Sequence, residues 1–187
     1  MNESDVLEIR RLVSEAAAGV SEQYFMLPVA DANGGEPLIQ YRERVYAYEL
    51  YHQLRSRWPK SPWPYSLGGE VDKLGHPIVR DGDLEAAKPD LLAHVPGTME
   101  NNLLVVEIKA ARPRENPNDR AAIERDLSKL VAFRDVGYAW AILLVFGDSV
   151  ERIRDYAHDS QKVRDNLHLI ELYHHHRPEE PARGVAW

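Results

Sequence analysis

Two apolar segments joined by a turn-rich connection stand at the centre of the chain. Residues 91–95 are LLAHV, residues 103–110 are LLVVEIKA, and Pro, Gly and Asn punctuate the stretch between them. This pattern predicts a β-hairpin. Because successive side chains of a strand point to opposite faces, one face of the second strand is apolar and turned toward the core. The other face carries Leu103, Val105, Glu107 and Lys109.

The predicted turn also determines which residues of the hairpin lie opposite each other. If the connection turns at its midpoint, Asp90 lies opposite Glu107, and Pro96 lies opposite Asn101. Cross-strand neighbours have Cβ atoms about 4.5 to 5.5 Å apart, a separation at which two carboxylates can share a divalent ion. Lys109 stands on the same face as Glu107. Since opposed like charges destabilise a sheet, this pair requires a metal ion, an ammonium group or both.

Apolar periodicity predicts further elements on both sides of the hairpin. We expect helices at residues 4–19, 38–58, 117–136 and 149–165, and strands at residues 67–74, 138–146 and 167–173. The strand at 138–146 has no polar alternation, which is typical of burial on both faces. Residues 177–187 are expected to form a mobile tail. The length of 187 residues predicts a single domain over the whole chain, 1–187.

Polar residues within the predicted helices have both structural and functional interpretations. Glu49 lies in a run of mostly apolar and aromatic positions, so this helix is expected to be mostly buried. A hydrogen bond to a Tyr or Arg neighbour accounts for Glu49 on sequence grounds alone. His52, three residues on, either contacts a phosphate or satisfies Glu49. Asp126 and Lys129 have the spacing of a surface i,i+3 ion pair.

The hairpin carries a known combination of residues. Pro89-Asp90 followed by Glu107-Ile108-Lys109 on an apolar strand resembles the signature of the PD-(D/E)XK nuclease superfamily. The order of predicted helices and strands across residues 38–173 is similar to the αβββαβ core of that superfamily. The resemblance therefore implies an α/β fold with a restriction endonuclease-like core, in which helices flank a central mixed β-sheet.

The resemblance also implies roles for individual residues. The expected catalytic residues are Asp90, Glu107 and Lys109. The expected ligands of a Mg²⁺ or Mn²⁺ cofactor are Asp90, Glu107, the Ile108 carbonyl, Glu49 and Glu70. The expected contacts to substrate phosphates are Lys88, Arg112, Arg114, Lys129 and His52. The structural alternative for Lys129 is a surface ion pair. The structural alternative for Glu70 is a position at a solvated strand edge.

Composition limits the function classes. The chain has no cysteine, which excludes disulfides, thiolate metal sites and a cysteine nucleophile. No apolar run approaches 18 residues, and the first residues lack the apolar segment of a signal peptide, so we expect a cytoplasmic protein that does not enter a membrane. The net charge of −7 opposes broad attraction to nucleic acid.

Two hypotheses follow. The first is a metal-dependent nuclease that hydrolyses phosphodiester bonds in DNA, with RNA as the second choice. The second is a module that has the same fold but no catalysis and serves binding or assembly, which the acidic charge favours. An accessory subunit whose partner supplies nucleic-acid binding reconciles the site residues with the charge. A homodimer and a complex with a partner protein both stay open as assemblies.

Overall fold

The computed structural model describes residues 3–30, 34–35, 37–60, 62–69, 88–97, 101–112 and 117–187. Its helices are α1 (Glu3–Ala17), α2 (Glu22–Phe25), α3 (Glu43–Arg57), α4 (Asp119–Asp135), α5 (Glu151–Asp159) and the 3₁₀ helix Arg164–Leu169. Its strands are β1 (Leu27–Val29), β2 (Leu38–Gln40), β3 (Ser66–Gly69), β4 (Leu91–His94), β5 (Asn102–Ala111), β6 (Tyr138–Gly147), β7 (Glu171–His175) and β8 (Arg183–Val185). No helix within these ranges is long and apolar enough to span a membrane.

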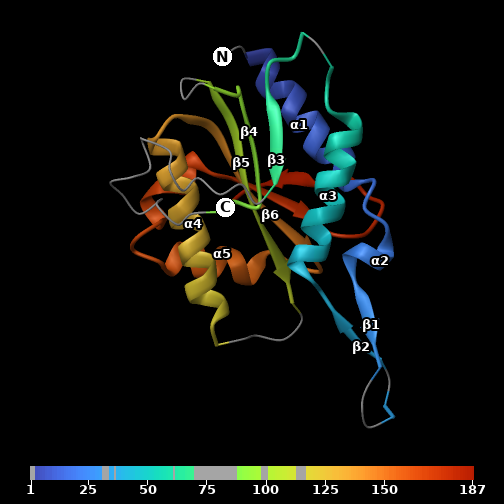
Figure 1. Ribbon diagram of the computed structural model, residues 1–187. Coiled ribbons are helices and arrows are strands. Elements are labelled where there is room, and N and C mark those ends of the chain that lie inside the picture. The colour runs from blue at the N-terminus through green and yellow to red at the C-terminus, as the bar shows by residue number, and fades with distance from the viewer. Residues whose placement is uncertain are drawn as a thin grey trace.

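A mixed six-stranded sheet forms the centre of the molecule (Figure 1). The strands lie in the order β3-β4-β5-β6-β7-β8. Neighbours are antiparallel from β3 to β5, parallel from β5 to β7, and antiparallel again between β7 and β8. The two parallel connections run through α4 and through α5 with the 3₁₀ helix, as parallel strands need a long crossover. The predicted α/β class with a central mixed sheet and flanking helices is confirmed.

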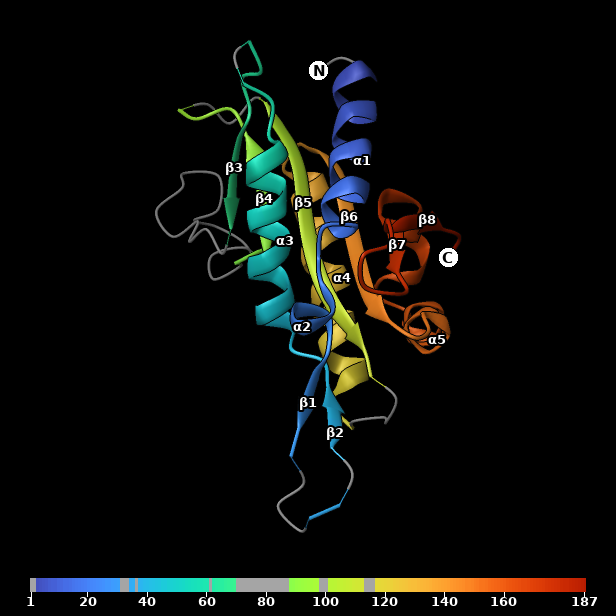
Figure 2. The same ribbon diagram turned by 90° about the vertical axis from the view of Figure 1, so that its right-hand side faces the viewer.

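Helices cover both faces of the sheet (Figures 1 and 2). Apolar residues of α1 and α3 pack with Leu104, Val106 and Ile108 of β5 in one core. Apolar residues of α4 and α5 pack with Val105 in a second core on the opposite face. This alternation matches the predicted faces of β5, with one exception. Leu103 belongs to the first core, close to an irregularity in the strand pairing.

The pairing of β4 with β5 follows the predicted register over most of the hairpin. Leu91 lies opposite Val106, and the same register continues to Ala93. A shift follows, so that His94 pairs with Asn102. A β-bulge of this kind inserts one extra residue into one strand. The pairing predicted at the turn end of the hairpin is therefore wrong by one residue. At the other end the ladder starts at Leu91 and Val106, so Asp90 precedes β4 and the predicted pair of Asp90 and Glu107 lies just beyond the observed ladder.

The helix predicted at residues 38–58 begins later than expected, at Glu43. Residues before it form β2, which pairs with β1 in a hairpin that projects from the body of the molecule (Figures 1 and 2). The helix is also less buried than predicted. Its inner face consists of Tyr46, Ala47, Leu50 and Leu54, while Tyr48 and His52 are exposed. The aromatic composition concealed an amphipathic helix, because tyrosine tolerates both environments.

The C-terminal segment also differs from the prediction. Residues 177–187 contain β8, which forms the last strand of the sheet, so the expected mobile tail is corrected. Ala182 is buried, and the Trp187 indole N–H donates a hydrogen bond to the Ile170 carbonyl at 2.7 Å. The strand expected at 167–173 begins at Glu171, after the 3₁₀ helix, and it is not the edge strand.

Gly147 permits a close approach between the ends of β5 and β6. Its φ is 116°, and a Cβ added there would lie 2.8 Å from the Ala111 carbonyl oxygen. Gly137 also has a positive φ, of 95°, but an added Cβ would meet nothing within 4 Å. We expect Gly147→Ala to lower the free energy of unfolding by about 1 to 3 kcal/mol, measured in urea, and by more than Gly137→Ala. Equal losses would show that backbone conformation alone determines the cost.

Candidate functional site

Two carboxylates bind backbone N–H groups of β5 in the part of the strand that extends past the first residue of β4. β4 begins at Leu91, opposite Val106, so the last residues of β5 have no β4 partner. Asp90 Oδ2 accepts a hydrogen bond from the Ile108 N–H at 2.7 Å. Glu43 Oε1, in the first turn of α3, accepts one from the Ala110 N–H at 3.3 Å. The acidic groups therefore replace a neighbouring strand.

The Ile108 carbonyl faces the same edge as the Asp90 carboxylate. A residue in a β-strand directs its N–H and its C=O to the same side of the strand. Because the Ile108 N–H points toward Asp90, its carbonyl oxygen also lies on that side of β5. Asp90 and the Ile108 carbonyl, both predicted as metal ligands, are thus neighbours.

Glu107 and Lys109 face α4, where each meets an oppositely charged residue. Lys129 Nζ lies 2.8 Å from Glu107 Oε1 and 3.1 Å from Asp126 Oδ1. Lys109 Nζ lies 2.7 Å from Asp126 Oδ2 and 3.4 Å from Glu43 Oε2. Each lysine therefore bridges two carboxylates. We call Asp90, Glu107, Asp126, Lys109 and Lys129 the carboxylate–lysine cluster.

Burial destabilises the ionised forms of the carboxylates in this cluster. Glu107 is 3% exposed and Asp126 is 9% exposed. Burial, followed by the charges of Asp126 and Asp90, raises the pKa of Glu107 to about 8. Burial also raises the pKa of Asp90, although the Ile108 N–H and Lys109 oppose the shift. With Glu43 and its partner Arg112 included, four carboxylates face three cationic side chains, which leaves one excess negative charge that a proton on Glu107 or a bound cation can neutralise.

Both lysines stay charged despite their surroundings. Burial acts to lower the pKa of Lys109, but Asp126 and Glu43 outweigh it, and the pKa is raised. Burial likewise acts to lower the pKa of Lys129, while Glu107 and Asp126 raise it overall. The cluster therefore holds two ammonium groups beside acidic groups at neutral pH.

Two oxygens of the cluster lack directed hydrogen bonds. Glu107 Oε1 and Asp126 Oδ2 are buried and accept no hydrogen bond of normal geometry, although a lysine nitrogen lies near each. Their partners are the lysine ammonium groups at 2.7 and 2.8 Å, which a bound cation would have to displace. In the present side-chain positions, however, no group of three or more His, Cys, Asp and Glu within the described ranges is arranged to hold a metal ion. Lys109 and Lys129 bridge the carboxylates instead.

No family model matches the chain, and the search of curated proteins found no match. The function of the cluster is therefore inferred from its own geometry. Its chemistry combines hard oxygen donors with ammonium groups from β5, from α4 and from the residue that precedes β4. Such a combination suits either an acid–base network or the binding of a hard cation and a phosphate.

The other predicted site residues have different surroundings. Glu49 Oε1 accepts a hydrogen bond from Gln53 Nε2 at 2.6 Å, so its partner is a glutamine rather than the expected Tyr or Arg. His52 and Lys88 are exposed. Arg112 contacts Glu43, with Nη2 and Oε1 3.7 Å apart. Glu70 and Arg114 lie outside the described residues.

Sequence reasoning missed two acidic residues of this site. The sequence predicts that Asp126 forms a surface ion pair. In the structure it lies on the apolar stripe of α4 formed by Ile123, Leu127 and Leu130. A charged residue within such a stripe is a usable signal for a buried interaction. Glu43 gave no comparable signal, because the predicted helix started at residue 38 and placed this residue within its second turn rather than at its start.

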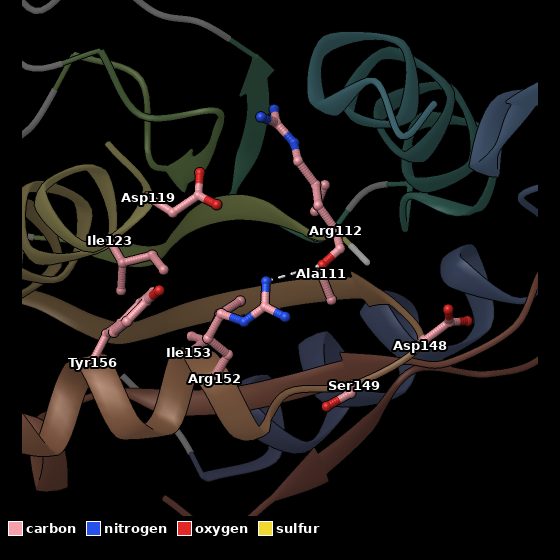
Figure 3. Close-up of a pocket in the computed structure, with 10 residues that line it drawn as sticks. Ala111, Arg112, Asp119, Ile123, Asp148, Ser149, Arg152, Ile153 and Tyr156 are labelled. Carbon is pink, nitrogen blue, oxygen red and sulfur yellow. Dashed lines mark hydrogen bonds between the residues drawn. The ribbon is translucent and has the colours of Figure 1, made fainter. Parts of the chain in front are cut away.

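Two cavities lie near the cluster. One, of about 190 Å³, lies at the carboxyl ends of β5 and β6 and is lined in part by Ile123, Ile153, Tyr156 and Arg152 (Figure 3). Arg152 donates to the Arg112 carbonyl at 3.3 Å, while the Arg112 side chain extends away from it (Figure 3). The other, of about 360 Å³, lies between α3 and the β3–β4 edge and includes Asp90 in its wall.

Proposed function

We propose that this chain is a divalent-metal-dependent nuclease that hydrolyses phosphodiester bonds in DNA, with RNA as the second substrate. The observation that carries the proposal is the 2.7 Å hydrogen bond between Asp90 Oδ2 and the Ile108 N–H. It joins the Pro89-Asp90 and Glu107-Ile108-Lys109 segments, which are separate in the sequence. The resemblance to PD-(D/E)XK nucleases requires this convergence.

The order of elements supports the same proposal. α3 precedes three antiparallel strands, β3 to β5, and α4 then leads to β6, which is parallel to β5. This order agrees with the αβββαβ core expected of a restriction endonuclease-like fold. Fold alone does not define activity, so the residues of the cluster must account for it.

The acidic residues fit a hard cation. Asp90, Glu107 and the Ile108 carbonyl would hold Mg²⁺ or Mn²⁺, since all three offer oxygen ligands. The excess negative charge around Glu107 supports this assignment. When bound, such an ion supplies Lewis-acid polarisation of the phosphate and a water nucleophile at neutral pH. Asp126 lies next to these groups and adds negative charge to the site.

The lysines would act on the substrate. Lys109 orients the attacking water and stabilises negative charge on the phosphorane-like transition state through its ammonium group. Lys129 contacts a phosphate once the charge of Glu107 is neutralised by a cation rather than by Lys129 itself. Glu107 must lose its proton before it binds a cation, so binding releases a proton and strengthens as the pH approaches 8.

Cleavage assays test the proposal. Purified protein is incubated with supercoiled plasmid, linear duplex, single-stranded DNA and single-stranded RNA, in Mg²⁺, in Mn²⁺ and in EDTA. We expect hydrolysis of at least one DNA substrate with metal and none in EDTA. A lack of cleavage on every substrate with both metals would contradict the proposal.

The ion pairs support a second candidate, a binding or assembly module. Lys109 and Lys129 each bridge two carboxylates, so the cluster is also a closed network that could stabilise the fold without a cation. The net charge of −7 supports this candidate as well. The response of the protein to metal separates the two.

The Asp90→Asn variant tests whether the protein is stabilised by metal through this site. Asparagine keeps an oxygen for the Ile108 N–H but removes one negative charge from the cluster. We expect the melting temperature in EDTA to be unchanged or higher, and most of the Mn²⁺ stabilisation of the wild type to disappear. Thermal melts in EDTA and in Mn²⁺ measure both effects, with the exposed Asp155→Asn as the control. A large loss in EDTA, with no Mn²⁺ response in the wild type, would favour the structural network.

A further inference from the structure

A stripe of arginine and tyrosine runs along the outer face of α3. Arg44, Tyr48, Tyr51 and Arg55 recur at intervals of four, three and four residues, which places them on one side of a helix. Tyr48 is 56% exposed, both arginines are exposed and Tyr51 is half-buried. The stripe, which we call the Arg–Tyr stripe, extends for about 16 Å along the helix axis.

The Arg–Tyr stripe borders the larger of the two cavities, the one that includes Asp90 in its wall. Tyr48 and Tyr51 line this space of about 360 Å³ together with Gly69, Asp90 and Leu91. A Cβ added at Gly69 would lie 3.4 Å from the Tyr51 ring, so the absence of a side chain there keeps room beside the aromatic group. α3 covers one face of the sheet beside β3 and β4 (Figure 2). The aromatic surface and Asp90 therefore share one cavity.

Local charge differs from the charge of the whole chain. Residues 42–57 contain four arginines and two glutamates, whereas the full sequence carries a net charge of −7. Two tyrosines between two arginines offer stacking surfaces with a phosphate contact at each end. In an acidic protein, this helix offers a surface whose charge complements a polyanion.

We infer that the Arg–Tyr stripe and its cavity bind an unpaired nucleic-acid strand, with bases stacked on Tyr48 and Tyr51 and phosphates beside Arg44 and Arg55. This inference rests on the proposed nuclease function and specifies its substrate class. In a duplex the faces of the bases are covered by their neighbours, so only an unpaired base can stack on a tyrosine within a cavity. A strand held in this way passes Asp90, where the scissile phosphate would lie.

Binding in EDTA tests the inference without cleavage. The probe is a fluorescein-labelled DNA strand roughly 16 nucleotides long, single or annealed to its complement, and anisotropy reports the dissociation constant. We expect tighter binding of the single strand. Tyr48→Ala and Tyr51→Ala should each weaken it by roughly 5- to 150-fold, the effect of one stacked base, while the Phe variants keep most of the affinity. Arg55→Ala should lower the salt dependence of binding.

Controls separate this inference from the proposed function. Tyr24→Ala removes another exposed tyrosine, on α2, and should bind like the wild type. Tyrosine-dependent binding without cleavage in metal would sustain the inference and refute the nuclease. Cleavage with unchanged affinity in both alanine variants, equal affinity for duplex, or no binding of either probe would overturn the inference. Thermal melts confirm that each variant is folded.

Discussion

Replacing Lys109 by alanine should reduce metal-dependent cleavage by about 10² to 10³-fold while metal binding persists. The Lys109 ammonium lies between Asp126 and Glu43, beside the carboxylates that would hold the ion, and it is not itself a ligand. Its loss removes the group that orients water and stabilises charge in the transition state. Single-turnover cleavage and Mn²⁺-dependent melting, measured on the same preparation, separate catalysis from metal binding.

Lys162→Ala is the matched control for this variant. Lys162 also forms an ion pair with a carboxylate, Glu124, at 3.2 Å, but its side chain is 77% exposed. Removing it should leave cleavage unchanged, because exposed ion pairs contribute little. Near wild-type turnover in Lys109→Ala would assign Lys109 to the structural network instead.

The second large effect concerns Glu107 and pH. Its pKa is raised from 4.5 to about 8 in the folded protein. Between these values the folded protein holds a proton that the unfolded chain releases, so stability is fully present below about pH 4.5 and falls as pH rises to about 8. The expected slope is about 1.4 kcal/mol per pH unit. Urea unfolding in EDTA from pH 5 to pH 8 measures it.

Glu107→Gln should remove this loss. The amide is neutral at every pH and occupies nearly the same volume, so the variant should match the wild type near pH 5 and exceed its stability at pH 8. Mn²⁺ should flatten the slope of the wild type only, because a bound cation favours the ionised carboxylate. The exposed Glu180→Gln should keep the wild-type slope. A wild type without any slope would contradict the proposed charge balance.

The hairpin was predictable because its geometry depends on local rules. The alternation of side chains along a strand predicts that Val105 points to the opposite face of the sheet from Leu104 and Val106. The assumption of a symmetric connection predicts that Leu91 pairs with Val106. The bulge at the turn end carried no sequence signal, since one inserted residue leaves the composition unchanged. It falls at the turn end, so the predicted register holds from Ala93 back to Leu91.

The partners of the cluster were less predictable because they come from distant elements. Asp126 and Lys129 are an i,i+3 pair, and only the packing of α4 on β5 shows that both face the sheet. Glu43 reaches β5 because α3 starts at that residue, a boundary that β2 sets. Tertiary contacts therefore decide which glutamate of this helix contacts the motif.

The C-terminal segment and α3 illustrate a related limit. Residues 183–185 lack a long apolar run, yet they complete the sheet beside β7, where the backbone supplies the pairing. In α3 the many tyrosines indicated a buried helix, although Tyr46 is buried and Tyr48 is exposed. Composition does not separate these two positions, but their angular positions on the helix do.

The most direct test of the nuclease site is a single-turnover assay on a 5′-labelled single-stranded oligonucleotide, with wild type and Asp90→Asn prepared in parallel. The proposal predicts hydrolysis by the wild type in Mn²⁺, no hydrolysis in EDTA, and a loss of about 10²-fold or more in Asp90→Asn despite an intact fold. Equal hydrolysis by both proteins, or none by the wild type in either Mn²⁺ or Mg²⁺, would contradict it.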